Sequence, residues 1–323
     1  MTRVHVLGTG GTIASRSGSS GRSASVRAEE LVRSVGGLPP GIEVESRDLV
    51  TEASFAFGTS DLLSIGREVR RCLTEDADGV VITHGTDVME ETAFLLDLVH
   101  ATSRPVVLTG AQRPFDHVAP DGPANLRDAI EVAASPSARD HGVLIVFDGY
   151  GFPARGVTKV DTQASHAFDA PGRGPSLRIA DRVQELARPR RPAALALDLE
   201  RDALPRVDVV PAYTGADGAQ LRAALAAGAA GIVVASLGSG NVGPLLLEAV
   251  TEAIGGGVPV LVCSRVPAGP AVPLYAGGGA ALERAGAVFG SDLSPWQGRL
   301  LLAAVCAVDP GDPAAAVRAW LEE

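Results

Sequence analysis

The chain has few cysteines and no long apolar run, and each shortage excludes a class of protein. Its three cysteines are Cys72, Cys263 and Cys306. An odd number without a CxxC or Cys/His cluster argues against a disulfide framework and against a zinc site, so we expect three reduced core thiols and no metal. Apolar residues make up 46% of the chain. None of its runs approaches the roughly eighteen residues of a membrane span, so we expect no membrane partner.

Positive charge is scarce as well. The net charge is −10, which argues against nucleic acid as a partner. The only lysine is Lys159, and arginine is used everywhere else. An ammonium can release a proton in a way that a guanidinium cannot, so the single lysine predicts a functional requirement at this position. The alternative is a solvated surface charge.

A secretory signal is also missing from the start of the sequence. Met1-Thr2-Arg3 leads directly into a strand-like segment, without a charged start, an apolar stretch and a cleavage site. We therefore expect a cytoplasmic protein, unless a leader has been trimmed.

Strand-like and helical patterns alternate along the chain, which predicts an α/β fold with two domains. The larger N-terminal domain, 1–187, is expected to hold a mostly parallel sheet flanked by helices, and the proline-rich stretch 188–206 is expected to be a linker. A smaller α/β domain would cover 207–323, with its last helix over 294–306. The predicted strands are 3–7, 79–83, 106–109, 142–147, 207–211, 231–235 and 258–262, and the other predicted helices are 62–73, 90–99, 122–134, 219–227 and 244–254.

Two threonine motifs carry the strongest functional signal. Gly8-Thr9-Gly10-Gly11-Thr12 follows one apolar run, and Thr83-His84-Gly85-Thr86-Asp87 follows another. Both turns are expected at the carboxyl edge of a parallel sheet, where ligands usually bind. Two hydroxyls brought together with a carboxylate indicate acyl transfer.

The segment after the first motif, residues 15–25, is rich in glycine and serine. Because these residues have little to pack with, we expect a mobile loop. Its position beside a reactive hydroxyl favours a lid, and a linker-like loop is the alternative.

Seven segments of the chain form an ordered set of motifs: 8–15, 83–92, 108–114, 121–126, 157–160, 211–215 and 264–267. Together they resemble the bacterial L-asparaginase and glutaminase-asparaginase family. This resemblance implies a homotetramer of two-domain α/β subunits with active sites at a subunit interface and no metal or organic cofactor. We therefore expect a homodimer or homotetramer that acts on a small amino-acid substrate.

Four residues are predicted to be catalytic. Thr12 is the candidate nucleophile, with a helix N-cap as the alternative. Lys159 would share a proton with the hydroxyl of Thr86, which positions the attacking water or relays a proton. Asp87 would orient the lysine or receive the substrate ammonium, and the sequence does not rank these two roles.

Further residues are predicted to bind the substrate. The resemblance assigns the oxyanion to the backbone N–H groups of Thr12 and Ala111. It places the substrate α-carboxylate at Thr59 and Ser60, which could instead be plain helix caps. Asn241 matches a position that reaches a neighbouring subunit's active site, and a turn-forming role is its alternative.

Two departures from the family pattern concern loops. Residues 16–27 lack the tyrosine that family members place beside the nucleophile. Either Ser19, Ser20, Ser23 or Ser25 replaces it, or Lys159 does more, or the enzyme is slow. Residues 268–279 lack an acidic residue, which argues against glutamine turnover.

The sequence thus predicts hydrolysis of L-asparagine to L-aspartate and ammonia through a threonine acyl-enzyme. One alternative keeps the mechanism and changes the substrate to glutamine, a D-amino acid amide or a short peptide. The other is a binding or sensor protein with negligible turnover.

Overall fold

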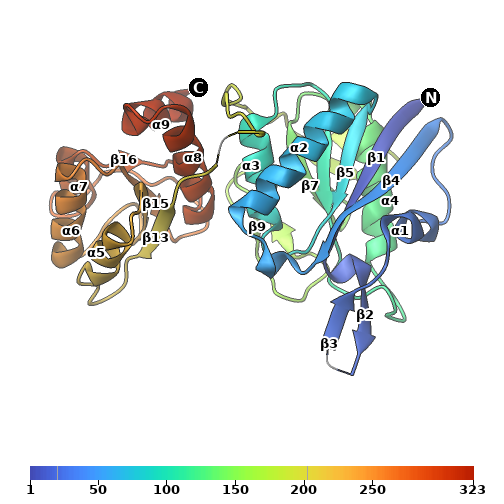
Figure 1. Cartoon of the computed structure of the whole chain (residues 1–323), viewed down its shortest axis with the longest axis horizontal. Coiled ribbons are helices and arrows are strands. Elements are labelled where there is room, and N and C mark those ends of the chain that lie inside the picture. The colour runs from blue at the N-terminus through green and yellow to red at the C-terminus, as the bar shows by residue number, and fades with distance from the viewer. Residues whose placement is uncertain (20, 202) are drawn as a thin grey trace. The chain divides into compact units, whose positions relative to one another are not determined.

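The computed structural model describes residues 1–19, 21–201 and 203–323, and the chain divides into two units, Met1–Arg191 and Pro192–Glu323 (Figure 1). Each unit is built on its own sheet with helices packed against it. This arrangement confirms the predicted α/β class with a larger N-terminal and a smaller C-terminal part. Residues 186–206 lie between the last strand of the first unit and the first strand of the second.

The first unit contains an eight-stranded sheet in the order β12-β11-β8-β7-β6-β5-β1-β4. The pairs from β7 through β4 are parallel, and β8, β11 and β12 extend the sheet with antiparallel pairs. The parallel strands are β1 Thr2–Gly10, β4 Ile42–Glu52, β5 Gly79–Thr83, β6 Val106–Thr109 and β7 Val143–Phe147, and the others are β8 Tyr150–Pro153, β11 Leu177–Ile179 and β12 Val183–Glu185.

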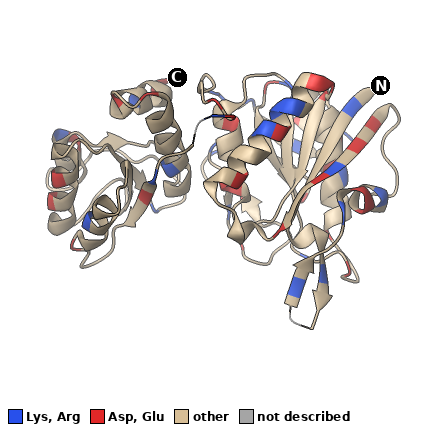
Figure 2. Cartoon of the chain, in the orientation of Figure 1, with Lys and Arg blue, Asp and Glu red and all other residues tan. Residues whose placement is uncertain are grey.

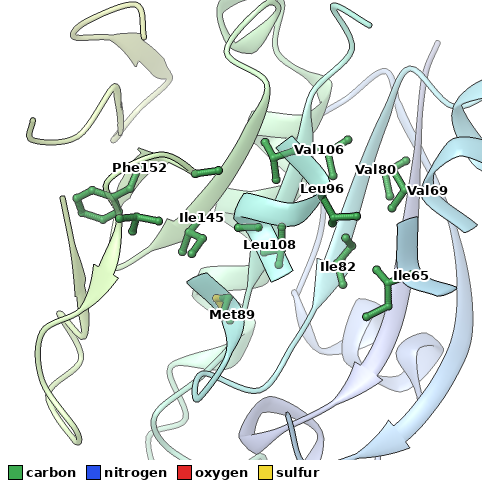
Figure 3. Close-up of a cluster of buried hydrophobic side chains, with 14 of the residues drawn as sticks. Ile65, Val69, Val80, Ile82, Met89, Leu96, Val106, Leu108, Ile145 and Phe152 are labelled. Atoms are coloured by element: carbon green, nitrogen blue, oxygen red, sulfur yellow. The ribbon is translucent and has the colours of Figure 1, made fainter. Parts of the chain in front are cut away.

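Helices cover both faces of this sheet because successive strand residues point to opposite sides. Leu7, Val80 and Ile82 pack with α2 (Thr59–Glu75) and α3 (Met89–Val99), as Figure 3 shows in part. The alternate residues, among them Val4, Val6 and Val81, pack with α1 (Ala28–Ser34) and α4 (Gly122–Ala134). The buried positions of α2 recur every three or four residues, which gives the helix one apolar face: Leu62, Leu63, Ile65, Gly66, Val69, Cys72 and Leu73.

Residues 15–18 and 21–24 form the two paired strands of a hairpin, within the segment 15–25 where a mobile loop was expected. Strand β2 (Ser15–Gly18) pairs with β3 (Gly21–Ala24), and the hairpin projects from the sheet in Figure 1. Asp116 accepts a hydrogen bond from the backbone N–H of Ser17 at 2.9 Å. Most of the hairpin's side chains are exposed, so it has no hydrophobic alternation by which the sequence could have indicated its strands.

The second unit contains a four-stranded parallel sheet in the order β13-β14-β15-β16. Helices α5, α6 and α7 share one core with the sheet, and α8 packs against β13, β14 and β15.

The prediction that 294–306 holds the last helix was wrong, because α9 follows and packs on α8. None of the described helices is both long and apolar enough to cross a membrane. The bounds are β13 Val207–Pro211, β14 Gly231–Ser236, β15 Val260–Ser264, β16 Val288–Phe289, α5 Ala219–Ala226, α6 Pro244–Gly255, α7 Gly279–Ala285, α8 Pro295–Val308 and α9 Pro313–Glu322.

Candidate active site

The two threonine motifs meet because their strands are neighbours. Strands β1 and β5 pair in parallel, with Gly8 opposite Thr83. The turns that follow them leave the sheet at the same edge, and their glycines touch. Gly11 has φ 80°, and a Cβ added there would lie 2.5 Å from the Cα and N of Gly85. Only glycine allows this approach without displacing backbone, so Gly11 brings Thr12 close to the turn that carries Thr86.

Thr12, Thr86 and Asp87 line one cavity of about 360 Å³. This volume lies in the range of small-ligand sites. The two threonines and the aspartate that the sequence motifs predicted to be catalytic therefore border a common space. The other lining residues are Gly11, Ser15, Arg22, Ser23, Ala24, Thr51, Ala53, Ser54, Phe55 and Gly85.

Lys159 reaches this group from a different part of the chain. It lies on the short strand β9 (Thr158–Lys159), which pairs with β10 (Phe168–Asp169). Its Nζ donates to Oγ1 of Thr86 at 2.8 Å and to Oδ1 of Asp87 at 3.1 Å. The side chain is 20% exposed, so the alternative of a solvated surface lysine is wrong.

Glu90 holds the backbone that carries this lysine. The side chain of Glu90, in the first turn of α3, accepts a hydrogen bond from the backbone N–H of Lys159 at 2.5 Å. Burial raises the pKa of this carboxyl group, and hydrogen bonds from Thr158 and from the Lys159 backbone oppose that shift. Glu90 lies within segment 83–92, one of the seven that carry the family resemblance, but sequence reasoning did not assign it a role.

His84 supports the turn between Thr83 and Thr86. Its Nδ1 lies 2.6 Å from the carbonyl oxygen of Gly85, and its Nε2 lies 3.1 Å from the hydroxyl of Thr92. Burial lowers the pKa of His84 to about 4. The ring is therefore neutral at pH 7, with its proton on Nδ1 facing the carbonyl acceptor. This role was also missed, although the residue lies inside the motif.

Thr12 begins the short 3₁₀ helix η1 (Thr12–Ala14), and its hydroxyl does not cap it. Gly11 occupies the N-cap position, and no side chain caps this turn. The alternative reading of Thr12 as an N-cap was therefore wrong. The neighbouring Ser15 hydroxyl donates to the carbonyl of Gly11 at 2.7 Å, which fixes the turn.

Thr59, Ser60 and Ala111 are not among the described residues that line the cavity. Thr59 and Ser60 begin α2, and Gly58 is the N-cap, so the alternative that they are the helix caps was wrong. The Asp61 side chain accepts from the Gly58 N–H at 2.7 Å. Ala111 is fully buried just after β6.

Asn241 belongs to the second unit and stabilises a turn there. Its backbone exchanges two hydrogen bonds with Leu237, and its Oδ1 accepts from the N–H of Gly279 at 3.1 Å. It also lines a second cavity, of about 530 Å³, together with Ser239 and Tyr275.

The hairpin supplies one wall of the cavity. Arg22, Ser23 and Ala24, all on β3, line it. Of the serines predicted to replace the family's loop tyrosine, Ser23 is in this set and Ser19 and Ser25 are not. Ser20 lies outside the described residues.

Comparison with known proteins finds similarity over nearly the whole chain. The family model "Asparaginase, N-terminal" matches residues 3–191, and "Glutaminase/Asparaginase C-terminal domain" matches residues 206–321. A probable L-asparaginase of Deinococcus radiodurans is 38% identical over 310 residues, which cover 94% of this chain and 92% of that protein. An L-asparaginase of Bacillus licheniformis is 33% identical over 310 residues, or 94% of this chain and 95% of the relative. The crystal structure of a probable cytoplasmic L-asparaginase from Campylobacter jejuni superposes with a TM-score of 0.89 at 28% identity, and the match covers 100% of both chains.

Proposed function

The chain belongs to the asparaginase family, and on that premise we propose that it hydrolyses the side-chain amide of L-asparagine to L-aspartate and ammonia. The observation that carries this proposal is the cavity that Thr12, Thr86 and Asp87 line together, with Lys159 bonded to both Thr86 and Asp87. The names of the Deinococcus and Bacillus relatives support asparagine as the substrate.

In the first half-reaction, the Thr12 hydroxyl attacks the amide carbon of the substrate. We assign the oxyanion that forms to the backbone N–H groups of Thr12 and Ala111, although Ala111 is fully buried and is not among the described residues that line the cavity. The proton lost from Thr12 passes to the leaving amide nitrogen, and ammonia departs as the C–N bond breaks. This leaves a β-aspartyl ester on Thr12.

In the second half-reaction, water attacks the ester. Thr86 positions this water, and Lys159, which donates to the Thr86 hydroxyl, mediates the proton transfer. The ester C–O bond breaks, the proton returns to Thr12, and L-aspartate leaves. The second step uses the Thr86 hydroxyl, which accepts a hydrogen bond from the Lys159 ammonium.

Substrate recognition requires a contact for each charged group of the amino acid. Asp87 is 54% exposed, and one of its oxygens bonds Lys159. We assign the other carboxylate oxygen of Asp87 to the substrate ammonium, so that this residue both orients the lysine and binds the substrate. Thr59 and Ser60, at the start of α2, are assigned to the α-carboxylate, although they do not line the cavity within this chain.

The missing loop tyrosine is replaced by Ser23 in this proposal. Ser23 is the hairpin serine whose side of β3 borders the same cavity as Thr12. We assign its hydroxyl a contact with the nucleophile or the bound amide, made without the large apolar surface of a phenol ring.

The assembly and the location follow from the same family membership. We propose a homodimer or homotetramer in which Asn241 of one subunit completes the site of another. A cytoplasmic location is proposed from the name of the Campylobacter protein. Sedimentation or light scattering of the purified protein tests the first of these statements.

The deciding experiment measures ammonia release from L-asparagine and L-glutamine side by side, from about pH 6 to about pH 10. Release from asparagine with little from glutamine supports the proposal. Release only from another amide, such as a D-amino acid amide or a short peptide, would keep the mechanism and change the substrate. Asparagine binding without any release would favour the binding-protein alternative.

A further inference from the structure

A second cluster of polar side chains lies on the α2 face of the sheet, away from the catalytic edge. We propose that His5, Glu45 and Asp76 form a binding site for a divalent cation of the Zn²⁺ class. Their ligand atoms all lie within 4.8 Å of one another.

The fold places these three residues together. His5 on β1 is the register partner of Glu45 on β4, so both side chains stand on the same face of neighbouring strands. Asp76 directly follows α2, the helix that packs on this face. The Nε2 atom of His5 lies 3.1 Å from Oδ1 of Asp76 and 3.8 Å from Oε2 of Glu45.

The imidazole nitrogen that points into this cluster lacks a hydrogen bond. His5 is only 6% exposed, and within the described part of the chain its buried Nε2 has no hydrogen-bond partner despite the nearby carboxylates. A buried polar atom without a partner is costly. A bound metal ion would accept the lone pair of this nitrogen when the imidazole is neutral, and the buried atom would then have a partner.

The surrounding charge favours a divalent cation. Glu43, Glu45 and Asp76 contribute −3 and Arg3 contributes +1, which leaves −2 when His5 is neutral. Basic and acidic segments of β1 and β4 lie beside each other near the N-terminus in Figure 2. Arg3 bonds Oδ2 of Asp76, so it leaves Oδ1 directed at His5 and holds the carboxylate in place.

The donor set selects the type of metal. One imidazole nitrogen with two carboxylate oxygens suits Zn²⁺ and similar ions better than Mg²⁺ or Ca²⁺, which prefer oxygen alone. Tetrahedral bonds of about 2.0 Å place ligand atoms about 3.3 Å apart. The Nε2 atom of His5 lies at comparable distances from the two carboxylates, 3.1 Å from Asp76 and 3.8 Å from Glu45. His5 lies five positions before Gly10, where β1 ends, or roughly 16 Å at strand spacing, and Thr12 follows beyond that end. We therefore expect the ion to act on stability and not on the reaction.

The test titrates ZnCl₂ into the metal-stripped full-length protein by calorimetry and follows the thermal unfolding midpoint. We expect one Zn²⁺ per chain and a midpoint that rises with its concentration. Glu45→Gln and His5→Gln should each weaken binding at least about tenfold. Glu43→Gln removes the same charge from the same strand without removing a ligand, and it should leave binding within about twofold of the unmodified protein.

Three results would overturn the site. The first is the absence of saturable Zn²⁺ binding. The second is equal weakening by Glu43→Gln and Glu45→Gln, which would indicate diffuse attraction to an acidic surface. The third is an equal response to Mg²⁺ or Ca²⁺, which would exclude ligation by the His5 nitrogen. Because Glu45 is largely exposed, Glu45→Gln keeps the test valid even if His5→Gln does not fold.

Discussion

The ammonium nitrogen of Lys159 lies 2.8 Å from the hydroxyl oxygen of Thr86, across 73 positions of sequence. The chain has no other lysine with which to make this contact. The turn after β5 and the short strand β9 therefore depend on each other for the geometry of the cavity. A second bond, to Asp87, fixes the direction of the ammonium.

Replacing Lys159 tests whether a removable proton is needed. We expect both Lys159→Met and Lys159→Arg to lower kcat by about 10²-fold or more, since general acid–base catalysis contributes on this scale. The arginine variant keeps the charge but cannot release a proton at working pH. Ammonia release under saturating asparagine measures the effect, and near-normal kcat in Lys159→Arg would mean that charge alone is sufficient.

Removal of the Thr12 hydroxyl should stop the reaction. We expect Thr12→Ala to lose at least about 10³-fold in turnover, because loss of a covalent nucleophile removes the whole pathway. Its fold should persist, since the hydroxyl caps no helix. Thr74→Ala, which deletes a hydroxyl on the exposed side of α2, serves as the matched control and should retain full activity. Turnover in Thr12→Ala comparable to that control would reject the nucleophile assignment.

The hairpin serines differ in their access to the cavity, so they form a matched pair. Ser23 lines the cavity and Ser19 is exposed on the same hairpin. Loss of one hydrogen bond to the reacting group is worth about 1 kcal/mol, so we expect Ser23→Ala to lower kcat about fivefold. Ser19→Ala should change it little. Equal effects from both substitutions would show that the hairpin acts through its backbone or its motion.

The catalytic motifs could be predicted because they lie next to strands. Buried strands such as β5 are continuous apolar runs, and the residues that follow them reach the ligand-binding edge of a parallel sheet. The lysine was found because it is unique in the chain. Thr86 and Asp87 could be proposed as its partners from the motif. The contact itself joins residues 73 positions apart, so it depends on the tertiary structure and leaves no local sequence pattern.

Other elements had no local signal. Strand β4 is largely exposed, and β2 and β3 have almost no apolar side chains, so their pairing is fixed by backbone hydrogen bonds that leave no periodicity. The hydroxyl of Ser54 accepts from the N–H of Asp87 at 3.3 Å, although it belongs to an unremarkable turn before α2. Such supporting residues become visible only when the fold is known.

A methyl group at Gly11 should separate the two threonine turns. The added Cβ would lie 2.5 Å from backbone atoms of Gly85, and φ is 80° at this position. We expect Gly11→Ala to lower kcat/KM by about 10²-fold, because small displacements of a reacting group are costly. Gly228→Ala provides the control, since Gly228 has φ +82° with nothing within 4 Å of the added atom. It carries the same backbone strain without the clash, and asparagine turnover should be unchanged. If neither Gly11→Ala nor Gly228→Ala loses activity, the proposed contact between the two turns is contradicted.

The buried ring of His84 should make the protein less stable in mild acid. Its pKa is lowered to about 4 by burial, against 6.5 in the unfolded chain. Between these values the unfolded state binds one more proton than the folded state. The contribution of His84 is therefore complete above about pH 6.5 and is lost progressively as the pH falls toward 4. A difference of about 2.5 pKa units corresponds to about 3 kcal/mol over this window.

The His84→Gln variant removes this titration while keeping a polar side chain of similar reach. It should unfold at lower urea concentration at pH 7.5, because the bonds to Gly85 and Thr92 are weakened. The informative quantity is the dependence on pH. Between about pH 7.5 and pH 5, the free energy of unfolding should fall less steeply in the variant than in the unmodified protein. His100 and His141, whose pKa values burial also lowers, contribute equally to both proteins and cancel in the comparison. Parallel profiles at one fixed protein concentration would mean that His84 titrates normally and that its burial is relieved in solution.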